Sequence, residues 1–154
     1  GDGRGRQKQR SDAGAGVALG VDGSASNDSS HLLAEARMAL LLQRVQGAPT
    51  ALSAEDVLWM ATRGGAAVLG REDIGQLSAG KADVIGIDVA RLDYAGALHD
   101  PLGALVFCQP QGIDLSIING QIVVEDGHLS TLELKPVIER HNSISRDLVR
   151  GEHS

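Results

Sequence analysis

Apolar residues in the first half of the chain are spaced in ways typical of a strand and of helices. A short apolar run at 17–21, flanked by glycines, has the length and the boundaries of a buried strand. A helix is predicted at 31–46, where apolar side chains recur every three or four positions. A second helical stretch begins at Ser53 with a sequence that resembles a capping box. Inside it, Gly64-Gly65 either interrupts the helix or permits close packing.

The second half of the chain changes to shorter, strand-like patterns. A strand is predicted at 82–88, and a short apolar helix or turn at 101–107, which Asp100 can cap. The strongest turn signal is Asn119-Gly120, which lies between two apolar runs and predicts a hairpin with a type I′ turn. A second turn is predicted at Asp126-Gly127, so these strands form a meander.

A final helix is predicted at 136–149. Its apolar positions recur at helical spacing and predict a buried stripe made of Val137, Ile138, His141, Ile144 and Leu148. Residues 1–15 have no periodicity and predict a poorly ordered tail, whose alternating basic residues leave an RNA-binding arm as the alternative.

Composition narrows the class of protein. The chain has 154 residues, enough for one domain or for a piece of a larger one. With one Trp, one Tyr and one Phe, the core must consist of aliphatic side chains, and base-stacking nucleic-acid modules are disfavoured. A net charge of −6 predicts no binding to nucleic acid or to an anionic membrane. A single cysteine excludes an internal disulfide, and we expect a cytoplasmic protein.

The residues that follow the apolar run at 17–21 are the first candidates for chemistry. Asp22 ends the run, and a loop of small polar residues follows it. An Asp at the tip of a buried strand is a common metal ligand or proton carrier in α/β enzymes, although a turn Asp that caps the next helix is the alternative. Ser24, Ser26 and Asn27 either line a substrate mouth or serve as helix caps and loop hydrogen-bonding groups.

Several sequence motifs, taken in order, resemble one enzyme family. They are Leu-Gly-Val-Asp-Gly-Ser-Ala-Ser-Asn-Asp at 19–28, Ala-Thr-Arg-Gly-Gly-Ala-Ala-Val-Leu-Gly at 61–70, Ile-Gly-Gln-Leu-Ser-Ala-Gly-Lys-Ala-Asp at 74–83, and Ile-Ile-Asn-Gly-Gln-Ile-Val-Val at 117–124. Across residues 16–149 the chain resembles the C-terminal third of the amidohydrolase superfamily. It is most similar to the metal-dependent deaminase branch of 8-oxoguanine deaminases, guanine deaminase-like enzymes and triazine hydrolases. The run at 99–108 favours the 8-oxoguanine deaminases.

The resemblance implies an α/β fold that is the C-terminal part of a (β/α)8 TIM-like barrel, with part of a small composite β-sandwich and a closing helix. In these terms residues 1–15 are the tail, and 16–72 hold the last barrel strand and its helices. Residues 73–133 are the β-rich composite segment, and 134–150 are the C-terminal helix. We therefore expect the chain to be the C-terminal segment of a longer enzyme.

The resemblance also implies an activity, the deamination of a purine-like N-heterocycle of the 8-oxoguanine or guanine type by a metal-activated water. The full-length enzyme would hold one divalent metal, zinc or alternatively iron. Asp22 would bind that metal and relay a proton, and Ser24, Ser26 and Asn27 would line the substrate site. The alternatives are a triazine or pyrimidine aminohydrolase of the same superfamily, and a non-catalytic module that oligomerises. A homo-oligomer is expected, because unpartnered apolar faces favour association.

The chain departs from the family pattern in its histidines. The family takes two metal ligands from a His-x-His sequence, and none of the five histidines here forms one. We therefore expect this segment to bind no metal by itself and to be inactive alone, because one carboxylate does not hold zinc. The Gly-Lys-Ala-Asp turn at 80–83 is also one residue shorter than the family's Gly-Lys-x-Ala-Asp.

Other residues of reactive types are predicted to have structural roles. His31 is expected to cap or flank the first helix, and His99 to anchor a loop. Asp83 is expected at a strand entry, and Cys108 as a small, partly buried apolar residue.

Overall fold

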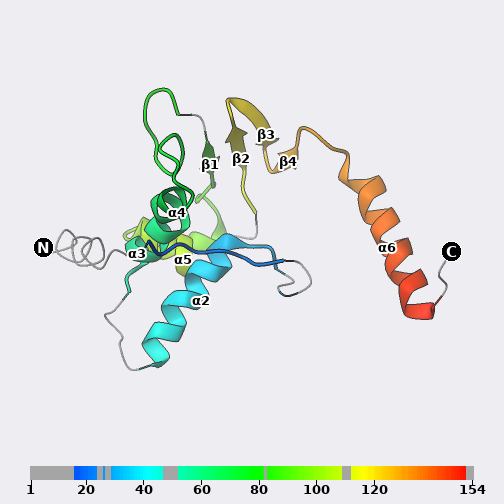
Figure 1. Ribbon diagram of the computed structural model, residues 1–154, viewed down its shortest axis with the longest axis horizontal. Coiled ribbons are helices and arrows are strands. Elements are labelled where there is room, and N and C mark those ends of the chain that lie inside the picture. The colour runs from blue at the N-terminus through cyan, green and yellow to red at the C-terminus, as the bar shows by residue number, and fades with distance from the viewer. Residues whose placement is uncertain are drawn as a thin grey trace, which may run out of the picture.

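The computed structural model describes residues 16–23, 26, 29–46, 52–81, 83–108 and 112–151. Helices lead the chain, a sheet follows and a helix closes it (Figure 1). The elements are α2 (Leu32–Val45), α3 (Ala54–Trp59), the π-helical turn η1 (Met60–Gly64), α4 (Gly65–Val68), β1 (Val84–Gly86), the 3-10 turn η2 (Leu92–Tyr94), α5 (Pro101–Phe107), β2 (Leu115–Ile118), β3 (Gln121–Glu125), β4 (His128–Leu129) and α6 (Leu134–Arg150). The predicted α/β class is confirmed.

The core lies where α2, α3 and α5 pack together. Ala36 and Leu40 from α2, Val57 from α3 and Val106 from α5 have no exposed surface and form one cluster. Complete burial of aliphatic side chains is the main stabilising contribution available to a chain with so few aromatics. The helices are therefore joined by their apolar faces, as the spacing predicted.

A capping side chain accepts a backbone N–H at the N-terminus of each of these helices. Ser53 and Asp56 form the predicted capping box at α3: the Ser53 Oγ accepts the Asp56 N–H at 3.2 Å, and the Asp56 carboxylate accepts the Ser53 N–H at 2.8 Å. The Asp100 carboxylate accepts the Gly103 N–H at 3.0 Å and caps α5, also as predicted. At α2 the cap is His31, whose Nδ1 accepts the Ala34 N–H at 3.3 Å.

The four strands form one antiparallel sheet in the order β1-β2-β3-β4. Asn119 and Gly120 have φ values of 49° and 76°, the left-handed conformations that a type I′ turn requires, so the predicted hairpin is confirmed. The Asp83 carboxylate accepts the Asn119 N–H at 2.9 Å and ties the turn to the entry of β1. A bulge near Ser116 shifts the register between β2 and β3.

Two sequence-based predictions are wrong. The apolar run at 17–21 is extended but forms no strand among the described residues, because no other strand lies beside it to complete a ladder. The predicted buried stripe of the last helix is exposed: Ile138 and Leu148 keep 54% and 58% of their surface in water. The helix itself is confirmed and ends at Gly151, which is left-handed as a C-cap glycine should be.

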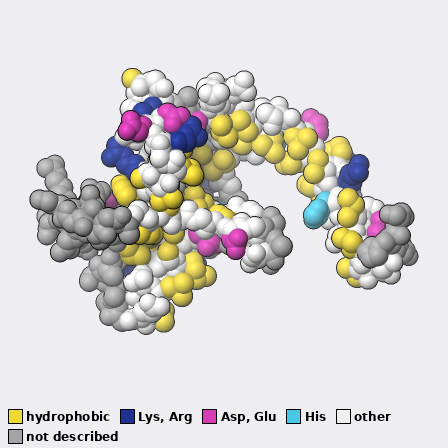
Figure 2. All heavy atoms as spheres, viewed as in Figure 1, with side chains coloured by type: hydrophobic (Ala, Val, Ile, Leu, Met, Phe, Trp, Pro, Cys, Tyr) yellow, Lys and Arg dark blue, Asp and Glu magenta, His cyan; other side chains and the backbone are white. Residues whose placement is uncertain are grey.

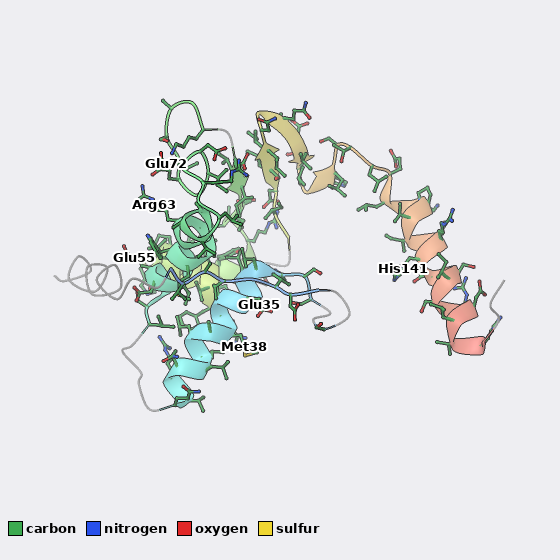
Figure 3. All side chains as sticks on the ribbon, viewed as in Figure 1. Glu35, Met38, Glu55, Arg63, Glu72 and His141 are labelled. Atoms are coloured by element: carbon green, nitrogen blue, oxygen red, sulfur yellow. The ribbon has the colours of Figure 1, made fainter. Side chains whose placement is uncertain are left out.

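The exposure of this stripe follows from the position of α6. The helix extends away from the sheet, and hydrophobic side chains continue from the strands along it (Figures 1 and 2). His141 projects from α6 at a distance from the other labelled side chains (Figure 3). Periodicity thus predicted which side chains share a face of α6, but not what covers that face. No helix in the described part of the chain is long and apolar enough to cross a bilayer.

Candidate functional site

Asp22 lies at the end of the extended run and is exposed. Its φ is 67°, a left-handed conformation that Asp tolerates better than most residues. The carboxylate Oδ1 accepts the Gly23 N–H at 2.8 Å, which supports this turn locally. The chain therefore turns at the candidate carboxylate and leaves it accessible from solvent.

Of the three candidate substrate residues, the structure describes Ser26. It is exposed in the turn after Asp22, and its N–H donates to the Gly23 carbonyl at 2.9 Å. Ser24 and Asn27 lie outside the described residues. A substrate role for these three residues stays a prediction.

The described residues do not form a complete metal site: no three of their His, Cys, Asp or Glu side chains lie together as ligands. Three of the histidines instead contact nearby backbone. His31 caps α2, His99 Nδ1 lies 3.1 Å from the Gly96 carbonyl, and His128 Nδ1 lies 2.8 Å from that of Asp126. The expected structural roles of His31 and His99 are confirmed.

A surface cavity of about 540 Å³ lies elsewhere and is not lined by Asp22. Arg63, Arg71 and Lys81 contribute three cationic groups to its wall. Arg63 donates to Gln76, and Lys81 donates to the Glu72 carbonyl. The first bond attaches the loop after α4 to η1, and the second joins two parts of that loop.

Arg71 is held by an acidic neighbour in the same loop. Its Nε donates to the Asp73 carboxylate at 2.9 Å. This hydrogen bond and the charge attraction raise the pKa of Arg71 and lower the pKa of Asp73. Both side chains are more than half exposed, so the pair contributes little to stability.

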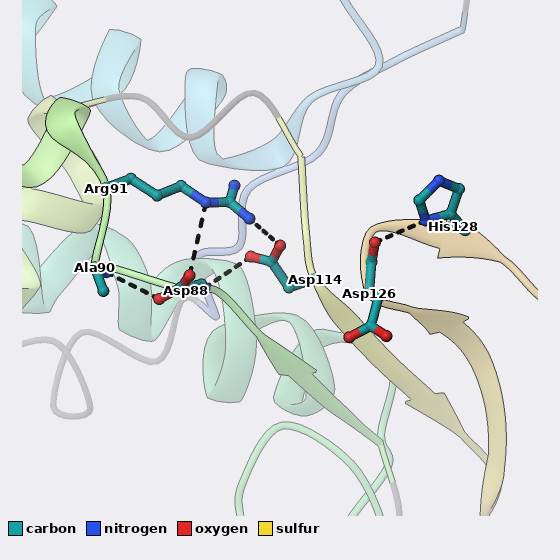
Figure 4. Close-up of polar contacts among 6 residues, drawn as sticks. All are labelled: Asp88, Ala90, Arg91, Asp114, Asp126 and His128. Atoms are coloured by element: carbon teal, nitrogen blue, oxygen red, sulfur yellow. Dashed lines mark hydrogen bonds and ion pairs between the residues drawn. The ribbon is translucent and has the colours of Figure 1, made fainter.

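A second polar network lies between the sheet and η2 (Figure 4). The Asp114 carboxylate accepts the Asp88 N–H at 2.7 Å and pairs with Arg91. The Asp88 N–H lowers the pKa of Asp114, and the bond from Arg91 lowers it further. Sequence reasoning missed this network, because its members are separated by up to 26 residues and share no motif.

The chain matches the family described as the amidohydrolase family over residues 6–123. It is 44% identical over 140 residues to an 8-oxoguanine deaminase of Pseudomonas aeruginosa, covering 90% of this chain and 31% of that protein. It is 39% identical over 147 residues to a hydroxydechloroatrazine ethylaminohydrolase of Pseudomonas sp. strain ADP, covering 91% of this chain and 30% of that protein.

A solved structure shows the same likeness in three dimensions. An adenosine deaminase from Xanthomonas campestris with bound zinc has a TM-score of 0.82 and 30% identity, over 96% of this chain and 34% of that one. The chain therefore spans about a third of the length of the curated relatives it matches.

Proposed function

This chain belongs to the amidohydrolase family, and we propose that it is the C-terminal part of a metal-dependent aminohydrolase that deaminates a purine-like N-heterocycle. The observation that carries the proposal is Asp22: it ends an apolar run inside the matched region and is exposed. In a barrel enzyme a carboxylate at the C-terminal end of a barrel strand faces the substrate, and the run at 17–21 would pair as such a strand only beside the other strands of the full-length enzyme. Residues 16–72 would supply the last barrel strand and helices, 73–133 the composite β-segment and 134–150 the closing helix.

The proposed substrate is a small heterocycle of the 8-oxoguanine or guanine type. It is supported by the 44% identity to an 8-oxoguanine deaminase. A triazine or pyrimidine aminohydrolase is the second candidate, since the hydroxydechloroatrazine relative is 39% identical over a similar length. Ser24, Ser26 and Asn27, which follow within five residues of Asp22, would lie beside either substrate.

Asp22 has two proposed roles, as an oxygen ligand of a divalent metal and as the acceptor of a proton. Zinc is favoured by the zinc-bound adenosine deaminase, and iron is the alternative. No three His, Cys, Asp or Glu side chains of the described residues lie together, so these residues do not fit a zinc ion, which takes three or four protein ligands. The remaining ligands would come from other parts of the full-length enzyme, and this chain is expected to bind no zinc by itself.

A chimera tests the proposal. The aligned third of the Pseudomonas aeruginosa 8-oxoguanine deaminase is replaced by the corresponding residues of this chain, and ammonia release from 8-oxoguanine and a hydroxylated triazine is measured. We expect activity toward the purine. Asp22→Asn should lower kcat by about 10²–10⁴-fold, the usual contribution of a proton-transferring group. Asp93→Asn is the matched control, because Asp93 is also an exposed carboxylate but lies on η2.

Three results would count against this assignment. A cooperatively folded chimera without activity would contradict the proposal that this chain is the C-terminal part of such a deaminase. Equal rates for the two Asp→Asn variants would contradict the role of Asp22. If the chimera does not fold, the 154-residue chain still tests the incomplete site, since stoichiometric zinc binding or deamination by it alone would overturn that part of the proposal.

A further inference from the structure

The extended run that leads to Asp22 is supported by η1, the π-helical turn. The Leu19 N–H donates to the Met60 carbonyl, the first residue of that turn, at 3.3 Å. The Leu19 side chain also packs against the buried core cluster. π-Helical turns are rare and recur at functional sites. The position of Asp22 therefore depends on how closely the run can approach η1.

Gly64, the last residue of η1, lies at the closest approach. It is buried, and a Cβ on it would lie 2.6 Å from the Val17 carbonyl oxygen and 3.1 Å from the Trp59 ring. The φ and ψ of Gly64, −60° and −46°, are ordinary helical values that any residue adopts. Glycine is thus required here by contact with the run and with the Trp59 ring rather than by backbone conformation.

We infer that Gly64 is a positioning residue for Asp22. Because it has no side chain, η1 can hold residues 17–19 in direct contact and so fix where the run ends. The inference rests on the proposed function, since it gives a reason for the placement of the proposed catalytic carboxylate. An alanine would force the backbones apart by about 0.8 Å, from 2.6 Å to the 3.4 Å of ordinary contact. Misplacement of a reacting group by about 1 Å can cost on the order of 10²-fold in rate.

The adjacent Gly65 provides a matched control. A Cβ on Gly65 would meet only the Met60 carbonyl oxygen, at 4.0 Å, which is ordinary contact. Its φ and ψ, −59° and −47°, are also helical. Alanine is favoured over glycine inside a helix. Gly65→Ala is therefore expected to be neutral or stabilising, although it makes the same chemical change one position away.

The first experiment measures amide hydrogen exchange in the 154-residue chain and in its two Gly→Ala variants. Gly64→Ala should raise the exchange rate of the Leu19 amide at least about tenfold, because the bond to Met60 is lost. The amides of Leu40 and Val57 in the core should keep their protection. Gly65→Ala should leave all three amides as they are in the parent chain.

The second experiment places the same variants in the active chimera. Gly64→Ala should lower kcat by about 10–10²-fold and weaken zinc binding in a chelator competition, with KM little changed. Gly65→Ala should change none of these values.

Each other outcome overturns the inference. If Gly64→Ala leaves the exchange rate of the Leu19 amide unchanged, or if Gly65→Ala raises it equally, Gly64 does not fix the position of residues 17–19. If Leu40 and Val57 lose protection together with Leu19, Gly64 supports the whole fold rather than this run. If the run is displaced while kcat and zinc affinity persist, its position does not matter to the site. The exchange result needs no activity, so it is read separately from failure of the proposed function.

Discussion

Leu40→Ala tests the core directly. Leu40 lies on α2 with no exposed surface, and it packs with Val57 of α3 and Val106 of α5. Truncation to alanine removes three buried carbons and leaves a cavity between three helices. Buried Leu→Ala substitutions cost about 2–5 kcal/mol of unfolding free energy. We expect Leu40→Ala to fall in this range, because its neighbours belong to separate elements that cannot all close on the cavity.

Leu42→Ala is the matched control on the same helix. Leu42 keeps 52% of its surface exposed, so the substitution removes about half as much buried apolar area and leaves no enclosed cavity. Its expected cost is about 1 kcal/mol or less. Both free energies are obtained from urea unfolding followed by circular dichroism at several protein concentrations. The slope with urea must stay constant for the comparison to hold.

Equal losses from Leu40→Ala and Leu42→Ala would refute the assigned burial and show that the outer face of α2 is covered in solution. A loss for Leu42→Ala that grows with protein concentration would identify a second copy of the chain as the cover.

Acidification should weaken the junction at Asp114. The Asp88 N–H and Arg91 lower the pKa of Asp114 in the folded chain. The ionised carboxylate therefore stabilises the fold at pH values above the ordinary pKa of Asp, and this stabilisation is lost as the pH falls below about 4. The stability difference between the parent chain and Asp114→Asn should therefore shrink between pH 6 and pH 3, and a constant difference would contradict this. The exposed stripe of α6 should cause self-association in sedimentation velocity. A monodisperse monomer that melts cooperatively would contradict that prediction.

Features encoded by a few adjacent residues were predictable from the sequence. Asn119-Gly120 determines a hairpin because only such residues accept both left-handed conformations. The capping box of Ser53 and Asp56 is equally local. The predicted role of Asp83 at the strand entry is confirmed, and Cys108 is partly buried as expected.

Features that depend on distant partners were not predictable. The apolar run at 17–21 has the composition of a strand, but a ladder requires a neighbour that no local pattern supplies. Gly64 appears in the sequence as one of two adjacent glycines, and only the fold distinguishes it by bringing Val17 against it. The catalytic role of Asp22 rests on resemblance and remains a prediction.

The position of α5 determines which parts of this chain can fold independently. Its flanking segments lead from β1 and into β2, whereas its Val106 belongs to the core formed with α2 and α3. A truncation after residue 72 would preserve α2 and α3 but expose Leu40 and Val57 where Val106 covered them. The helical part before β1 is therefore not an autonomous folding unit, and limited proteolysis between β1 and α5 should unfold it rather than release it intact.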